Sequence, residues 1–297
     1  MPKSFYNGCE NEQKPYENRK IHVLEIHQRQ YYNKKIRAKI HGPDSLLQKE
    51  ERTIMEKQKV YRAGFYVLGL LILAMGLTLN TQAGLGVSPI ISVSYSISTI
   101  FHLNFGDMTL VLYSVFVVAE IFLHSIRERQ RSSHQAEALV HARKNDRKLI
   151  LLMDILQIPL SLVFTRFLNV FGSLLPEFSK GTKGIQDLPL RLLVLILAII
   201  FTGVGASMSL SMRIVPNPGD GIVQAIADCI HKNVGFTKNC FDLFNITVTI
   251  LLGLVLAGRL VGVGIGTVLA VIGVGRIIAL FQHLAGEKIV ALSGVEV

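Results

Sequence analysis

The chain is poor in charged residues, and this shortage limits what it can be. Charged residues make up 18% of its 297 residues, whereas soluble globular domains carry about 25%. The shortage is local, because residues 63–106 contain no Asp, Glu, Lys or Arg. A transmembrane helix needs about 20 apolar residues, so this stretch alone is long enough for two crossings. The composition excludes a soluble enzyme and a disordered chain.

Cysteine is equally scarce. The chain has three cysteines, Cys9, Cys229 and Cys240, which are too few and too scattered for a disulfide framework. Cys229, His231 and Cys240 also lack the paired spacing of zinc ligands. No HExxH, GxSxG or Ser/His/Asp arrangement stands out. We therefore expect no catalytic residues, no metal site and no cofactor, and we predict that the protein is not an enzyme.

The net charge of +10 invites a nucleic-acid hypothesis, but the distribution of the basic residues argues against it. Of the 31 Lys and Arg residues, 14 lie in residues 1–62 and seven more lie between Arg127 and Lys148. They flank the apolar segments and are sparse inside them. Polytopic membrane proteins distribute positive charge in this way. We expect the lipid bilayer as a partner and no nucleic acid.

Alternating polar and apolar segments divide the chain into five parts. We predict a basic cytoplasmic tail, a first membrane repeat with a cytoplasmic loop at 127–148, an extracytoplasmic loop, a second membrane repeat and a cytoplasmic C-terminal tail. These parts cover residues 1–60, 61–170, 171–190, 191–283 and 284–297 in that order. The first tail has no apolar h-region near Met1, so we expect no cleavable signal peptide. It is either a polar, disordered extension or the result of a mis-assigned start, with translation beginning at Met55.

An internal repeat is visible without gaps at a shift of 129 residues. The pattern repeats a span, a turn broken by proline, a short helix, an Asn-x-Gly turn and a second span. Eight identities share this register: Leu68 with Leu197, Gly76 with Gly205, Pro89 with Pro218, Ile97 with Ile226, His102 with His231, Asn104 with Asn233, Gly106 with Gly235, and Ile121 with Ile250. Matches among Gly, Pro, His and Asn are rarer by chance than matches among apolar residues. We therefore predict a duplication.

The positive charges also predict the topology. If all eight apolar segments cross, either the tail or the loop 127–148 lies outside, against the positive-inside rule. If the two short segments, about 88–103 and 217–233, enter the membrane and return, both basic regions lie inside. Three crossings in each half then give the halves opposite orientations, as in the inverted repeats of many secondary transporters. We predict an all-α fold with about six crossings and two re-entrant half-helices.

The second short helix carries the most distinctive polar pattern. Asp220, Gln224, Asp228 and His231 are spaced by four, four and three residues, which places them on one helix face. Two such half-helices meeting at the membrane centre would present backbone N–H groups to a solute. The predicted binding residues are Ser88, Pro89, Asn217, Pro218, Asp220, Gln224, Asp228 and Asp242. The alternative is an amphipathic helix at the membrane interface, with Asp220 as a simple N-cap.

Other ionisable residues lie within or at the edges of spans, namely Glu120, Asp154, Arg166, Asp242 and Arg276. An intramembrane charge costs at least about 2.5 kcal/mol, so it is usually paired or functional. Asp242 either pairs with Lys238 one turn away or lies in the repeat interface with Asn245 and Thr249. For Arg166 and Arg276, snorkelling to the membrane surface is the simpler interpretation.

The glycine series Gly258, Gly262, Gly264 and Gly266 is not a nucleotide-binding loop, because no strand precedes it and no Lys-Ser/Thr follows. Small residues four apart in an apolar span favour close helix packing. We therefore predict that these glycines lie in a helix interface.

Several stretches resemble the YczE/YyaS/YitT-type family of bacterial membrane proteins. They are Ala-Gly-Leu-Gly-Val-Ser-Pro at 83–89, Leu-Gln-Ile-Pro-Leu at 156–160, Val-Pro-Asn-Pro-Gly-Asp-Gly-Ile-Val-Gln at 215–224, Gly-Phe-Thr-Lys-Asn-Cys-Phe-Asp at 235–242, and the stretch from Gly-Ile-Gly-Thr at 264–267 to Gly-Arg at 275–276. The resemblance covers about residues 60–283 and leaves out residues 1–54. It implies a multi-pass protein of the bacterial cytoplasmic membrane and no particular activity.

Together these patterns predict a secondary transporter or exporter of a small polar or anionic solute, with its N-terminus inside the cell. The alternative is a membrane scaffold or regulatory protein that does not transport and uses the repeat only for packing. An aqueous cavity between the repeats favours the first hypothesis. A dry interface in which every polar group is paired favours the second.

Overall fold

The computed structural model describes residues 45–132, 140–178, 188–232 and 234–295. Every regular element in these ranges is a helix. The chain divides into two compact units, residues 1–57 and residues 58–297. Most of the first unit, and with it most of the predicted tail 1–60, lies outside the described residues. The membrane helices belong to the second unit, to which the contacts below refer.

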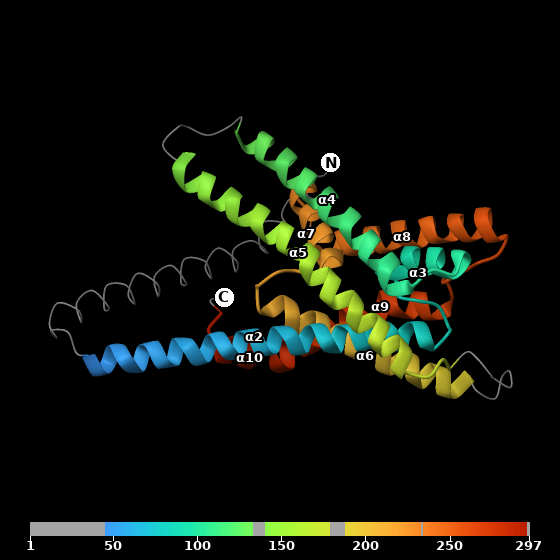
Figure 1. Ribbon diagram of the computed structural model, residues 1–297, viewed down its shortest axis with the longest axis horizontal. Helices are drawn as coiled ribbons and strands as arrows, with labels where there is room; N and C mark the ends of the chain where they lie inside the picture. The colour runs from blue at the N-terminus through green and yellow to red at the C-terminus, as the bar shows by residue number, and fades with distance from the viewer. Residues whose placement is uncertain (1–44, 133–139, 179–187, 233, 296–297) are drawn as a thin grey trace, which may run out of the picture. The chain divides into compact units, whose positions relative to one another are not determined.

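Among the described residues, six helical segments are long and apolar enough to cross a membrane, which confirms the predicted all-α membrane fold. Five lie in α2 (Ser45–Gln82), α4 (Phe105–Ser132), α5 (Val140–Leu174), α6 (Leu188–Ser211) and α8 (Val234–Ala257), shown in Figure 1. The sixth begins with α9 (Ile265–Phe281) and continues through a π-helical turn, η3 (Gln282–Gly286), and a final helix, α10 (Glu287–Ser293). Several helices extend into segments predicted as loops or tails, because Glu, Gln, Lys and Arg are good helix formers outside the membrane as well.

Two short helices, α3 (Pro89–Phe101) and α7 (Pro218–Ile230), interrupt the series. Each has 13 residues and begins with proline, which suits the first helical position because its missing N–H needs no partner there. Each ends at a histidine in the left-handed conformation, His102 and His231. The bounds of α3 and α7 therefore coincide at the shift of 129 residues found in the sequence.

The same shift relates the neighbouring helices. Helices α2 and α6 end at Gln82 and Ser211, and helices α4 and α8 begin at Phe105 and Val234. Matching bounds at both ends of the short helices support the predicted duplication.

Helices α2 and α6 pack closely and run antiparallel, and glycines make the close approach possible. A Cβ atom on Gly69 would lie 2.7 Å from the backbone nitrogen of Ser209, and one on Gly76 would lie 2.5 Å from that of Thr202. A Cβ atom on Gly205 would likewise come too close to the backbone nitrogen of Leu73 on α2. As residue numbers increase along α2, the numbers of the contacting residues on α6 decrease. These two equivalent helices therefore run in opposite directions.

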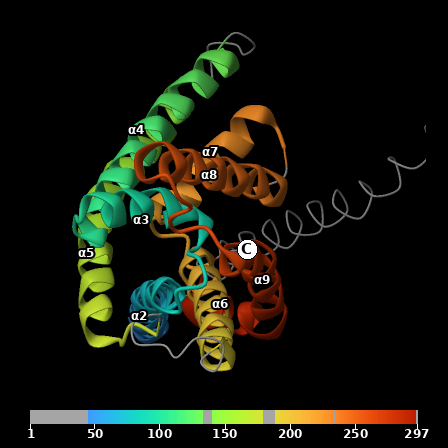
Figure 2. The same cartoon turned by 90° about the vertical axis from the view of Figure 1, so that its right-hand side faces the viewer.

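The short helices pack against the opposite half of the chain. Helix α3 lies along α8, and α7 lies along α4, as Figures 1 and 2 both show. Two contacts at equivalent positions join each short helix to the other half of the chain. Ser92 of α3 forms a hydroxyl–hydroxyl hydrogen bond of 2.7 Å with Thr249 of α8. At the equivalent positions, Gly221 of α7 contacts the Glu120 carboxylate of α4. The two halves therefore share one interior.

The glycine series occupies a different place from the one predicted. Gly258 and Gly262 lie between α8 and α9, where both have positive φ, and Gly264 and Gly266 flank the start of α9. This segment packs on the turn that follows α2. Val87 donates its N–H to the Gly262 carbonyl at 2.9 Å, and Gly266 donates to the Leu85 carbonyl at 2.7 Å. The glycines allow two loops, rather than two helices, to approach each other.

Candidate functional site

The N-termini of α3 and α7 lie at a common cavity. Ser88 and Asn217 precede these helices at equivalent positions, both are buried, and neither side chain caps its own helix. The Asn217 side chain instead approaches the buried Tyr113 hydroxyl at 3.4 Å. The Asn217 amide, which would normally close the helix start, is therefore directed to another partner.

The cavity has a volume of about 40 Å³ and is bounded by both halves of the chain. Its polar lining comes from Ser88, Thr202, Asn217, Asp220, Lys238 and Asp242, and its apolar lining comes mainly from α2, α6 and α9. A site of about 10–15 Å³ with polar partners is enough for one water molecule. The cavity therefore has room for a few water molecules or a very small solute.

Charges of both signs meet in the cavity. The Lys238 ammonium lies 3.1 Å from Asp242 Oδ2, and the Asp242 residue is 3% exposed. Asp220, at the first turn of α7, lies in the electrostatic field of this pair. Both interpretations of Asp242 hold together, because it pairs with Lys238 and also lies between the halves with Asn245 and Thr249 buried further along α8.

The structure brings five of the eight predicted binding residues to the cavity: Ser88, Pro89, Asn217, Asp220 and Asp242. Pro218 begins α7 beside them. Gln224 and Asp228 do not line the cavity. Gln224 is exposed and donates to Asp228 at 3.1 Å, while Asp228 forms an ion pair of 2.5 Å with Arg127 of α4. The polar face of α7 therefore divides between the cavity and the contact with α4.

Of the ionisable residues noted in the spans, Arg166 forms an exposed ion pair with Asp107 at 2.9 Å. Arg276 is exposed on α9. Glu120 and Asp154 are each 3% exposed, so they do not reach out to solvent.

Sequence reasoning missed a pair of arginines that join the halves. Arg62 of α2 donates from Nε to the Met212 carbonyl at 2.7 Å and from Nη2 to the Arg213 carbonyl at 2.8 Å. Arg191 of α6 donates in the same way to the Ala83 and Gly84 carbonyls.

Donors and acceptors of these two contacts are all related by the shift of 129. Each arginine thus caps the C-terminal end of the other half's first helix, where positive charge is favourable. A search for equal residues at this shift would have found Arg62 and Arg191.

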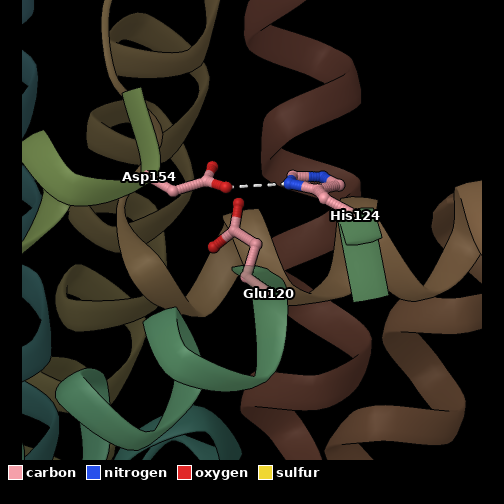
Figure 3. A group of neighbouring side chains, drawn as sticks. All are labelled: Glu120, His124 and Asp154. Atoms are coloured by element: carbon pink, nitrogen blue, oxygen red, sulfur yellow. Dashed lines mark hydrogen bonds and ion pairs between the residues drawn. The ribbon is translucent and has the colours of Figure 1, made fainter. Parts of the chain in front are cut away.

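Sequence reasoning noted Glu120 and Asp154 separately, but missed that they form a buried polar cluster between α4 and α5 (Figure 3). His124 Nδ1 lies 2.9 Å from Asp154 Oδ2, and the Glu120 carboxylate lies beside them. Gln157 donates to both Glu120 oxygens at 3.0 Å. The spacing Glu-x3-His on one span and Asp-x2-Gln on the next was the available signal, since residues three and four apart share a helix face.

In the described part of the chain, six apolar helical spans and many exposed large apolar side chains define an integral membrane protein. A family of unknown function (DUF6198) matches residues 60–283, and the chain belongs to this family. This confirms the resemblance found in the sequence.

Two relatives come from Bacillus subtilis (strain 168). The "Uncharacterized membrane protein YczE" is 26% identical over 227 residues, which cover 75% of this chain and 86% of the relative. The "Uncharacterized protein YyaS" is 24% identical over 222 residues, covering 74% and 92%. No solved structure matches the chain.

Proposed function

We propose that the protein is a secondary transporter or exporter of a small polar or anionic solute in the bacterial cytoplasmic membrane. The cavity at the start of α3 and α7 carries this proposal. Transporters with inverted repeats place the substrate at the repeat interface, near the ends of broken helices. Here residues of both halves line one cavity, and polar and charged groups form part of its lining.

The antiparallel packing of α2 and α6 supports an inverted repeat. A helix of 13 residues is about 20 Å long at 1.5 Å per residue, whereas the hydrocarbon core is about 30 Å thick. Helices α3 and α7 are therefore too short to cross. Re-entrant placement of both keeps the two basic regions on the inner side, together with the N-terminus.

The lining of the cavity favours a solute with a negatively charged or strongly polar group. Lys238 and the N-terminal turns of two helices attract anions. Asp220 and Asp242 accept hydrogen bonds from hydroxyl or amino groups. A solute that carries both kinds of group, such as a small zwitterion, uses the whole lining.

One observation favours the alternative, a scaffold or regulator that does not transport. A volume of about 40 Å³ is smaller than most organic solutes, and ligand sites usually have about 300–1,000 Å³. For a transporter, the present arrangement is an occluded state that must widen. The two hypotheses therefore differ in whether a solute stabilises the protein.

The first test concerns topology. In a chain with Cys9, Cys229 and Cys240 replaced by serine, single cysteines are placed at Ser133 and at Lys183, which lie outside the described residues. An impermeant thiol reagent applied to intact cells is expected to label the cysteine at 183 and not the one at 133. Opened cells provide the control, because both positions should then react. Labelling of position 133 from outside contradicts the inverted repeat.

The second test concerns the solute. Purified protein is screened against small polar and anionic solutes by thermal shift, and stabilising solutes are assayed for uptake into proteoliposomes. A solute at about 100 times its Kd stabilises the folded state by about 2.7 kcal/mol. Asp220→Asn is expected to weaken binding at least tenfold and to abolish uptake, because the amide preserves size but removes the charge.

Asp107→Asn is the matched control, since Asp107 pairs with Arg166 at an exposed position. It is expected to bind and transport as the wild type does. The N-cap of α7 is Asn217, three residues before Asp220, so the interpretation of Asp220 as a simple N-cap is wrong. If Asp220 only stabilises the first turn of α7, Asp220→Asn keeps full uptake. If Asp220→Asn and Asp242→Asn both melt normally and keep full uptake, the cavity is not the solute-binding site.

A further inference from the structure

The buried cluster between α4 and α5 lies outside the cavity and has no role in the proposed transport. Glu120 and His124 follow one another at i and i+4 on α4, and Asp154 faces them from α5 (Figure 3). One ligand atom from each residue lies within 4.8 Å of the other two. Glu120 and Asp154 are each 3% exposed.

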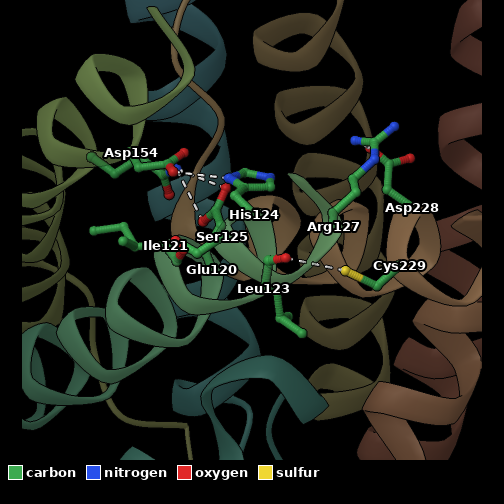
Figure 4. A network of polar contacts seen from close by, with 10 residues as sticks. Glu120, Ile121, Leu123, His124, Ser125, Arg127, Asp154, Asp228 and Cys229 are labelled. Carbon is green, nitrogen blue, oxygen red and sulfur yellow. Dashed lines mark hydrogen bonds and ion pairs between the residues drawn. The ribbon is translucent and has the colours of Figure 1, made fainter. Parts of the chain in front are cut away.

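Two buried carboxylates close together between two apolar spans repel each other unless a positive charge lies between them. The His124 imidazole contacts Asp154 at 2.9 Å, and a single protonated imidazole balances one carboxylate. Arg127, the next basic residue along α4, is engaged by Asp228 of α7 (Figure 4). One carboxylate charge thus remains to be neutralised by a proton or by a bound cation.

Gln157 provides an independent observation that favours a cation. It is 0% exposed, and its amide group lies against the Glu120 carboxylate, with Nε2 3.0 Å from both oxygens. Its Oε1 atom is buried and has no hydrogen-bond partner among the residues that the structure describes. Leaving a buried acceptor unsatisfied costs about 1–3 kcal/mol. Rotation of the amide by half a turn directs this oxygen into the cluster, where a cation would satisfy it.

The donor set selects the kind of cation. Imidazole nitrogen suits zinc and other first-row transition metals, whereas Mg²⁺ and Ca²⁺ prefer oxygen ligands. Ligands about 2.1 Å from Zn²⁺ are at most about 4.2 Å apart. A spread of 4.8 Å needs only small side-chain rotations to reach this geometry. The His124 side chain is 19% exposed and offers a path of entry.

The cluster is confined to the first half of the chain. At a shift of 129 residues, Glu120, His124, Asp154 and Gln157 correspond to Thr249, Gly253, His283 and Gly286. It is therefore not a by-product of the repeat. Glu120 also contacts Gly221 at the start of α7, because a Cβ there would lie 2.7 Å from the carboxylate.

From this geometry we propose that Glu120, His124 and Asp154, with Gln157 as a fourth ligand, bind one divalent transition-metal ion that joins α4 to α5 beside α7. The sequence predicted no metal site, because these ligands come from two spans and form no known motif. The proposal does not depend on transport.

Co²⁺ is the probe, because its visible absorption reports nitrogen and oxygen coordination. The full-length protein, without an affinity tag, is treated with a chelator, desalted and titrated in detergent. One equivalent is expected to bind with a saturable absorption band, and Zn²⁺ is expected to displace it. Glu120→Gln and His124→Gln are each expected to raise the Kd for Co²⁺ at least about 100-fold, since even loss of an outer-shell partner costs about 10–100-fold.

Two further variants keep the test decisive. His283→Gln, at the position equivalent to Asp154, removes an exposed imidazole and is expected to leave the band unchanged. It measures the background from the chain's nine histidines. Gln157→Glu adds a carboxylate ligand and is expected to tighten Co²⁺ binding about tenfold. No saturable band in the folded wild type, or an equal band in the His124 variant, overturns the proposal. In that case a proton, and not a metal ion, neutralises the remaining carboxylate charge.

Discussion

Arg191→Leu is expected to lower the free energy of unfolding by about 2–4 kcal/mol. The guanidinium donates to the Ala83 and Gly84 carbonyls at the end of α2. Hydrogen bonds from a charged donor contribute about 1.5–3 kcal/mol each, and partial exposure of this contact lowers the sum. The effect is measured as a loss of thermal stability in detergent. Arg62→Leu is expected to cause a similar loss, because its contacts are equivalent.

Arg191→Lys separates geometry from charge. Lysine keeps the positive charge near the helix end but cannot donate from two nitrogens in a fixed plane, so we expect about half the loss. Arg276→Leu, at an exposed arginine on α9, provides the control and is expected to change stability by less than about 0.5 kcal/mol. If Arg191→Leu melts like the Arg276 variant, the arginine contacts do not stabilise the fold.

Gly76→Ala is expected to destabilise the protein by about 3 kcal/mol, the upper part of the usual range for overpacking. A Cβ atom at this position would lie 2.5 Å from the Thr202 backbone nitrogen. Backbone atoms cannot move aside as a flexible side chain can, so α2 and α6 must separate. Because the cavity is bounded by both helices, we also expect weaker solute binding. Both effects are measured on protein purified in one detergent.

Gly64→Ala is the matched control, because it makes the same change on the same helix. A Cβ atom at Gly64 would have no atom of the described residues within 4 Å, apart from its own neighbourhood in the helix. Alanine also has the higher helix propensity, by about 0.8–1 kcal/mol. We expect this variant to melt at or above the wild-type temperature. Equal losses in both variants mean that a general effect of Gly→Ala substitution in α2, and not the contact with α6, explains the result at Gly76.

Much of the fold follows from local patterns in the sequence. The absence of charge over residues 63–106 and the lengths of the other apolar runs predict the spans, and Pro89 and Pro218 predict the starts of the short helices. The shift of 129 residues predicts which helices correspond. Helix ends beyond the membrane are less predictable, because polar residues there fit a helix or a loop equally well.

The site could be predicted only in part. Ser88, Asn217 and Asp220 lie beside proline breaks, and the repeat marks them as candidates. Helical periodicity places Asp220 and Asp228 on one face, but it does not say that Arg127 of another helix pairs with Asp228. The contacts of Arg191 with Ala83 join residues 108 positions apart. Such partners depend on the packing of whole helices, which local spacing does not encode.

The exchange of contacts between the halves has a consequence for biosynthesis. When residues 58–132 enter the membrane, the carbonyls of Ala83 and Gly84 do not yet have Arg191 as a donor, and α3 does not yet have α8 to pack against. Counted from Ala83 and from the end of α3, more than 100 further residues must be synthesised before either partner exists. The first half therefore stays incomplete in the membrane during synthesis, and neither half expressed alone should reach its final structure. Co-expression of the two halves as separate chains should restore it, because every missing partner is then supplied in trans.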